Sequence, residues 1–255
     1  MIYVLSDIHG NKENFDTILE KIDLRMEDFL YVLGDVVDRH PYGIQLLQQI
    51  MGMPNARMLP GNHEWMMMKA LGISHPMLKT KEEGGSIVYE AMMRKMLARR
   101  AEKERFALWY GNGGDVTHKA WKGLSDDERK ELGNFLSSLP LSYDVNVNGK
   151  DYKLVHAAPT ELYRKFSGAE YENEAEFAVW DREMFKYRFP FGAAIIFGHT
   201  PTLYMQDNNP LEIWDAGDMV GIDCGSGIQE LSGLYSVKGR LACLRLDDWK
   251  VFYSK

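Results

Sequence analysis

The sequence has little cysteine. Its 255 residues include only Cys224 and Cys243, which lack the CxxC spacing of a metal or redox pair and cannot build a disulfide framework. It also lacks the run of about eighteen apolar residues that a membrane-spanning helix needs, and its N-terminus lacks the basic segment of a secretory signal. These absences predict a cytoplasmic protein that does not enter a membrane.

An excess of basic charge is also missing. The chain has 30 Lys and Arg against 37 Asp and Glu, which gives a net charge of −7 at pH 7. Nucleic-acid polymers and membrane surfaces are usually bound by a basic surface, so neither is expected as a partner. The composition is that of an ordinary globular protein. We predict a single domain over residues 1–255, and the sequence leaves its oligomeric state open.

Short apolar runs alternate with segments of helical spacing in the first quarter of the chain. The runs 2–5, 29–33 and 56–59 predict strands, and the apolar residues of 12–22 and 42–50 recur at helical spacing. Strands that are joined by helical crossovers should be parallel. This part of the chain therefore predicts half of an α/β sheet.

Later segments continue the pattern with more hairpins. Runs 152–156 and 193–199 predict two further strands, and Asn148-Gly149 predicts the turn of a hairpin before the first of them. Residues 125–128 form a capping box that should open a helix ending near 138. The tail after residue 220 is rich in strand formers, with a turn expected near Lys238-Gly239.

Segment 82–107 differs from the rest because it predicts a long helix that is rich in methionine and basic residues. One interpretation is a surface helix with a solvated basic face. The other is a lid or recruiting element above a site for an anionic partner. We predict a helical insertion at about 72–107 in either case.

Polar side chains follow five of the predicted strands at the point where each strand ends. They are Asp7 with His9, Asp35, Asn62, His156 and His199. Ligands of open α/β sheets bind beyond the carboxyl ends of the strands. Mixed oxygen and imidazole ligands suit manganese, iron or zinc, and six of them suit two ions that share a carboxylate.

Four motifs, "DIHG", "GDVVDR", "GNHE" and "FGHT", resemble the signature of the calcineurin-like metallophosphoesterases, in the version typical of the phosphoprotein phosphatase branch. "GNGGDVT", "VWDRE" and "GIDCGSG" are similar to segments of bacterial and phage members. The resemblance implies a four-layer α/β/β/α sandwich of two mixed sheets, with a dinuclear metal site between them. We expect the C-terminal hairpins to form much of the second sheet.

The resemblance also implies a role for each site residue. Asp7, His9 and Asp35 would hold the first metal, and Asp35 would bridge to a second metal held by Asn62, His156 and His199. His63 resembles the general acid, and Asp38 is expected to orient it and raise its pKa. Arg39 and Arg182 resemble the pair that grips phosphate oxygens, and Asn112 is expected to contact substrate.

Two of these residue assignments are open to another interpretation. Arg182 can instead be a surface arginine paired with Asp181 or Glu183. The family's glycine after "DR" is His40 in this chain, followed by Pro41, which puts the course of the loop carrying Arg39 in question.

The leading function is a metal-dependent phosphatase that hydrolyses phosphoserine or phosphothreonine on proteins, or phosphotyrosine, by direct attack of a metal-bridging hydroxide. Its partner would be a phosphorylated protein or a small phosphate ester, and manganese, iron or zinc would be the cofactor. One alternative is a hydrolase of dinucleoside polyphosphates such as diadenosine tetraphosphate. Another is a catalytically silent metal-binding scaffold.

Overall fold

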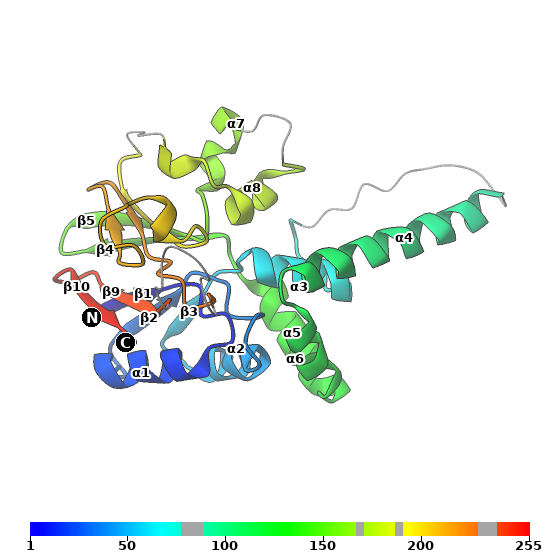
Figure 1. The fold of residues 1–255 in the computed structure, drawn as a ribbon, viewed down its shortest axis with the longest axis horizontal. Helices are drawn as coiled ribbons and strands as arrows, with labels where there is room; N and C mark the ends of the chain where they lie inside the picture. Colours follow the sequence, from blue (N-terminus) through cyan, green and yellow to red (C-terminus); the bar gives the residue numbers. More distant parts are fainter. Residues whose placement is uncertain (78–88, 167–170, 187–190, 229–238) are drawn as a thin grey trace.

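The computed structural model describes residues 1–77, 89–166, 171–186, 191–228 and 239–255, with side chains for all of these except 89–96. Two five-stranded mixed sheets form its centre (Figure 1). The first sheet has the order β10-β9-β1-β2-β3, and the second has the order β4-β5-β6-β8-β7.

The first sheet contains the predicted parallel strands. They are β1 (Ile2–Leu5), β2 (Phe29–Val32) and β3 (Ala56–Met58), joined by α1 (Lys12–Ile22) and α2 (Gly43–Gly52). The side chain of Asn11 caps α1 by accepting a hydrogen bond from the N–H of Asn14 at 3.2 Å. The predicted strands and helices are confirmed here, and the two crossover helices lie on one face of the sheet (Figure 1).

The second sheet is built from the middle of the chain. Its strands are β4 (Ser142–Val147), β5 (Lys150–Val155), β6 (Ala194–Phe197), β7 (Trp214–Asp215) and β8 (Met219–Gly221). Asn148 and Gly149 both have positive φ, 52° and 81°, as the predicted two-residue hairpin turn requires. Strands β5, β6 and β8 are parallel, so their carboxyl ends meet at one edge.

One expectation about the sheets was wrong. The C-terminal hairpin, β9 (Ala242–Arg245) and β10 (Lys250–Tyr253), does not extend the second sheet, because β9 pairs antiparallel with β1 in the first. This pairing covers the edge of β1 that β2 leaves free, and an unpaired edge of a central strand would be a liability. The turn expected near Lys238-Gly239 lies partly outside the described residues.

The four-layer arrangement is confirmed. Apolar side chains from both sheets, such as Val4, Leu154 and Ile196, form a core between them. A second core joins the outer face of the first sheet to α1 and α2, and a third joins the second sheet to α8 (Glu174–Trp180) and its neighbours. Figure 1 shows the helices outside the two sheets.

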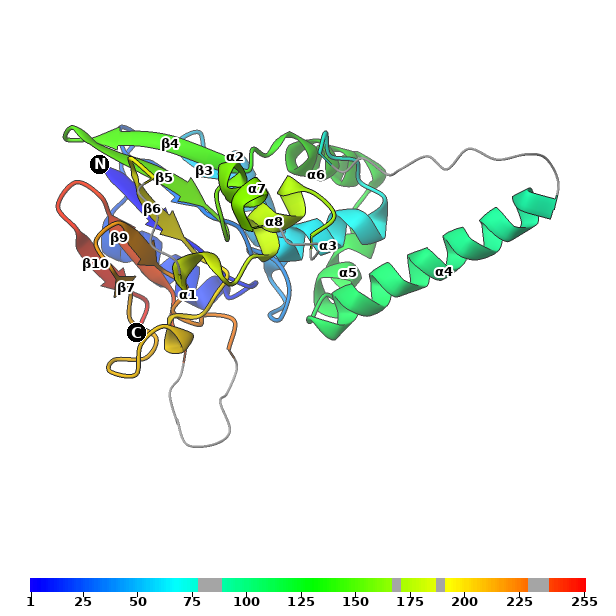
Figure 2. The ribbon, with the colours of Figure 1, turned by 90° about the horizontal axis from the view of Figure 1, so that it is seen from above.

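The remaining helices lie beside the carboxyl ends of the strands. They are α3 (Asn62–Leu71), α4 (Tyr89–Gly111), α5 (Asp115–Lys122), α6 (Asp126–Ser138), α7 (Tyr163–Phe166) and the short η1 (Thr160–Leu162), η2 (Met184–Lys186) and η3 (Thr202–Tyr204). The capping box at Ser125 and Glu128 is confirmed. Helix α4 projects away from the body in both views (Figures 1 and 2), and the part of the predicted helix before residue 89 lies outside the described residues. Among the described helices, none is both long enough and apolar enough to span a membrane.

Candidate metal centre

The side chains predicted from the strand ends meet between the two sheets. Asp7, His9, Asp35 and Asn62 follow β1, β2 and β3 of the first sheet, while His156 and His199 follow β5 and β6 of the second. All six side chains are at most 3% exposed. Two groups of possible ligand atoms share Asp35: the first is His9, Asp35 and His63, and the second is Asp35, His156 and His199.

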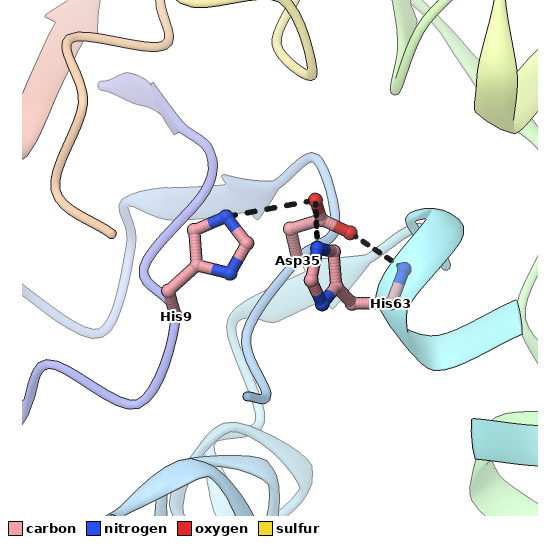
Figure 3. A group of neighbouring side chains, drawn as sticks. All are labelled: His9, Asp35 and His63. Atoms are coloured by element: carbon pink, nitrogen blue, oxygen red, sulfur yellow. Dashed lines mark hydrogen bonds and ion pairs between the residues drawn. The ribbon is translucent and has the colours of Figure 1, made fainter. Parts of the chain in front are cut away.

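The first group surrounds one oxygen of Asp35 (Figure 3). Asp35 Oδ2 lies 3.7 Å from His9 Nε2 and 3.9 Å from His63 Nε2. Asp7 Oδ1 lies 3.9 Å from His9 Nε2 and has no hydrogen-bond partner among the described residues. A buried carboxylate oxygen without a partner is costly, which is the condition that a bound cation relieves.

The second group surrounds the other oxygen of Asp35. Asp35 Oδ1 lies 3.6 Å from His156 Nε2. Asn62 Oδ1 lies 3.2 Å from the same nitrogen and 2.8 Å from His199 Nδ1. The two oxygens of Asp35 therefore face different groups, as a carboxylate shared by two ions would.

The orientation of the three imidazoles also fits metal binding. Each directs one ring nitrogen at a backbone carbonyl: His9 Nδ1 at Val37 (3.2 Å), His156 Nδ1 at Leu33 (2.7 Å) and His199 Nε2 at Trp180 (3.2 Å). A carbonyl oxygen can only accept, so that nitrogen carries the hydrogen and the other presents a lone pair to the group. Lone pairs that converge in this way need a cation between them.

The electrostatics of the site lead to the same conclusion. Burial and the neighbouring Asp35 raise the pKa of Asp7 to about 6, and burial raises the pKa of Asp35 to about 6. Burial lowers the pKa values of His9 and His199 well below the ordinary value. The protein thus presents neutral imidazoles and uncompensated carboxylates, which is the donor set of a transition-metal site.

His63 of the first group forms a buried pair with Asp38. His63 Nδ1 lies 2.7 Å from Asp38 Oδ2, and His63 Nε2 accepts a hydrogen bond from Arg39 at 3.3 Å. The expectation that Asp38 raises the pKa of His63 was wrong, because burial dominates and lowers it to about 4, while burial raises the pKa of Asp38 to about 7. Burial disfavours separate charges, so the pair keeps one proton in this short hydrogen bond.

The loop that carries Arg39 does not need a glycine at position 40. The left-handed residues are Asp38 (φ 72°) and Arg39 (φ 66°), and His40 is not among the residues with positive φ. The N–H of His40 donates to the carbonyl of His9 at 3.1 Å, which ties this loop to the one after β1. Replacement of the family's glycine by His40 is therefore accommodated without backbone strain at that position.

The two remaining predicted residues differ in position. Arg182 is exposed, and its guanidinium donates to the carbonyl of His199 at 3.2 Å, so it lies beside the second group. Asp181 accepts hydrogen bonds from backbone N–H groups and Tyr171. The amide of Asn112 donates to the carbonyl of Leu108 at 2.8 Å, so this side chain closes the end of α4.

Sequence reasoning missed three buried residues of the site. Glu64 accepts hydrogen bonds from four backbone N–H groups, those of Asp35, Val36, Val37 and Gly61. Its position three residues after the N-cap Gly61, as in a capping box, was the available signal. Asp223, whose pKa is raised to about 8 by burial and Asp7, and Trp109 had no comparable signal.

Comparisons with known proteins agree with this geometry. The sequence profile of the calcineurin-like phosphoesterases matches residues 1–203. The chain is also similar to the symmetrical bis(5'-nucleosyl)-tetraphosphatase of Aliivibrio fischeri (strain ATCC 700601 / ES114). The two are 23% identical over 283 residues, which cover 99% of this chain and 97% of that relative.

Two solved structures share the fold. The crystal structure of a candidate diadenosine tetraphosphatase has a TM-score of 0.57 at 15% identity, covering 99% of this chain and 91% of the other. A protein serine/threonine phosphatase from Saccharomyces cerevisiae has a TM-score of 0.50 at 14% identity, covering 99% and 78%. At these identities, both structures support the fold and leave the substrate open.

Proposed function

Because the chain belongs to the calcineurin-like phosphoesterase family, we propose that it hydrolyses dinucleoside polyphosphates at its two-metal centre. It is a phosphoric ester hydrolase, and the proposal concerns its substrate. The observation that carries it is the match over nearly the whole of both chains to a symmetrical bis(5'-nucleosyl)-tetraphosphatase. Symmetrical cleavage of diadenosine tetraphosphate would yield two molecules of ADP.

The proposed metal ligands are Asp7, His9, Asp35, Asn62, His156 and His199. Two cations bound there would supply an activated water at neutral pH and neutralise charge on the phosphate.

The other residues have roles that their own chemistry supports. Arg39 and Arg182 would bind phosphate oxygens, because a guanidinium can donate two parallel hydrogen bonds to them. His63 would take up a proton from solvent at Nε2 and pass it to the leaving oxygen, while its Nδ1 keeps the proton that it shares with Asp38.

Two partly exposed aromatic side chains, Trp180 and Tyr110, favour a nucleotide substrate. Trp65 and Trp109 are at most 1% exposed and cannot stack on a base. Trp180 is half-buried and packs edge-on against His199, with the ring centroids 6.1 Å apart. Tyr110 is 41% exposed, and its carbonyl accepts from Gly113, the residue that also binds the N–H of Arg39. An aromatic side chain can stack on a base with about 1–3 kcal/mol.

Protein phosphatase activity is the second candidate. It is favoured by the "GDVVDR" and "GNHE" motifs, which the phosphoprotein phosphatase branch shares with the tetraphosphatases. The same metals and arginines would act on a phosphoserine or phosphothreonine ester, so the motifs alone do not decide between the two substrates.

A rate comparison with Mn²⁺ tests the proposal. We expect diadenosine tetraphosphate to be cleaved much faster than a phosphoserine or a phosphotyrosine peptide, with ADP as the product. EDTA should abolish turnover, and so should Asp35→Asn, because both metal groups share this residue. Faster cleavage of a phosphopeptide would favour the second candidate, and absence of turnover on all three substrates would support a silent scaffold.

A further inference from the structure

The corner between α4 and α5, residues 109–117, is hydrogen-bonded to the loop that carries Asp38 and Arg39. Trp109 Nε1 donates to both oxygens of the Asp38 carboxylate, at 3.1 and 2.9 Å. The N–H of Asp38 donates to Thr117 Oγ1 at 2.9 Å, and the N–H of Arg39 donates to the carbonyl of Gly113 at 3.0 Å. Four hydrogen bonds therefore connect this corner to two left-handed residues of the site.

The Trp109 ring is held in one place. It is fully buried, and a side chain at Gly114 would not fit beside it, because a Cβ there would come within 2.3 Å of the indole. The N–H of the Gly114 backbone donates to the carbonyl of Trp109 at 3.0 Å, which closes the corner against the end of the helix. The direction of the indole N–H is thus set by packing, and it points at Asp38.

The position of Asp38 in turn sets that of His63. Asp38 Oδ2 accepts from Trp109 and also lies 2.7 Å from His63 Nδ1. Because Trp109 donates to both oxygens of Asp38, the carboxylate is held in one orientation. The His63 imidazole that contacts it then keeps Nδ1 protonated and Nε2 directed at the candidate metal centre. Trp109 touches neither the ligand groups nor, given its burial, a substrate.

From these contacts, we propose that Trp109 is a positioning residue for proton transfer: its indole N–H orients Asp38, which orients His63 toward the leaving group. This inference rests on the proposed function, because it requires His63 to donate that proton. It also assigns a role to α4, since the last turn of the projecting helix completes the site. Thr117, which accepts from the N–H of Asp38, has a supporting role in the same corner.

Kinetics with aryl phosphates of different leaving groups test the proposal, with Mn²⁺ present. Trp109→Phe keeps an aromatic ring and removes the N–H donor. We expect kcat for phenyl phosphate, which has a poor leaving group, to fall roughly 10- to 100-fold, a part of the roughly 10²–10⁴-fold that proton transfer contributes. The kcat for 2,4-dinitrophenyl phosphate, whose leaving group needs no proton, should change little, and KM should change little for both.

The chain supplies a matched control in Trp65, whose buried Nε1 has no hydrogen-bond partner among the described residues. Trp65→Phe makes the same chemical change. Any effect of this substitution on kcat should be the same for both aryl phosphates. In a variant that already carries Asp38→Asn, Trp109→Phe should lower kcat for phenyl phosphate little further, because the two residues act through one contact. Equal losses of kcat for both aryl phosphates would overturn the proposal, and so would losses that add in the double variant. Either result would mean that Trp109 contributes only to packing.

A second measurement does not depend on turnover. In the metal-free protein labelled with ¹⁵N-histidine, two-bond ¹⁵N–¹H correlation spectra report which nitrogen of His63 is protonated, with His63→Asn assigning the signals. We expect Nδ1 protonation in the parent and a mixture of tautomers in Trp109→Phe. An unchanged tautomer would overturn the inference. Failure of the parent to cleave any phosphate ester would instead count against the proposed function.

Discussion

Several residues of the candidate metal centre are held in a costly backbone conformation. Asp7, His9, Asp35 and His199 all have φ between 52° and 63°, as rarely seen for residues other than glycine. Each such residue costs on the order of 1–3 kcal/mol and persists only when its surroundings determine it. Strain that collects on four of the six proposed ligands indicates that the position of these side chains, rather than stability, decides their conformation.

Glu64 is the residue that most directly holds one of these loops. Its buried carboxylate accepts from three consecutive N–H groups after β2, those of Asp35, Val36 and Val37. In Glu64→Gln, an NH₂ group would replace one accepting oxygen and face these donors. We expect a loss of about 3 kcal/mol in the free energy of unfolding, since each unsatisfied buried donor costs about 1–3 kcal/mol. Urea denaturation in EDTA measures this loss without a contribution from metal.

An exposed glutamate provides the comparison. Glu131 lies in α6 with an exposed side chain, so Glu131→Gln should change the free energy of unfolding by no more than about 0.5 kcal/mol. Equal stability of Glu64→Gln and the parent protein would show that the loop after β2 does not depend on this carboxylate.

At the scale of elements, the junction between β3 and α3 brings the ligand loops together. Gly61 precedes α3, and a Cβ at this position would come within 2.1 Å of Asp35 Oδ1 and 2.7 Å of His156 Cε1. Gly61→Ala should therefore displace the shared carboxylate, with loss of Mn²⁺ binding in calorimetric titration and of turnover. Retention of parental metal affinity would contradict this account.

The same substitution elsewhere should have the opposite effect. Gly133 lies inside α6, and a Cβ there would meet nothing within 4 Å. Gly133→Ala should raise the free energy of unfolding by about 0.5–1 kcal/mol, because alanine loses less conformational freedom in a helix. Its metal affinity and turnover should equal those of the parent.

Local signals in the sequence predict elements and strand ends well. The spacing over 12–22 predicts α1 with its observed ends, and the strand ends carry the side chains that meet in the structure. The pairing partner of a strand cannot be predicted from such local signals. Nothing in residues 242–245 indicates that they pair with β1, more than two hundred residues earlier. For the same reason, the contact between Trp109 and Asp38 could not be predicted, since the two are 71 positions apart.

At the scale of the whole molecule, the candidate metal centre connects the two sheets. Asp35 and Asn62 follow strands of the first sheet, and His156 and His199 follow strands of the second. The sheets are otherwise joined by the apolar core between them. Ions bound to this set would link both halves of the fold, so metal binding should contribute to global stability as well as to catalysis.

Thermal unfolding with Mn²⁺ and with EDTA tests this link. A ligand present at a hundred times its Kd stabilises a protein by about 2.7 kcal/mol, which for a chain of this size corresponds to a rise in Tm of roughly 5–10 °C. We expect a rise of this order for the parent and for Gly133→Ala, whose Tm should be higher in both conditions. Asp35→Asn should lose the rise, because both ligand groups share that carboxylate.

The metal-free state of Asp35→Asn makes the test sharper. Asp35 lies near the buried Asp7, and the charge of Asp35 raises the pKa of the Asp7 carboxyl. Removing one of them relieves this repulsion, so Asp35→Asn in EDTA should melt no lower than the parent, although it cannot respond to Mn²⁺. A lower Tm in EDTA would mean that Asp35 stabilises the fold by itself, and a preserved Mn²⁺ response would mean that the ions bind elsewhere.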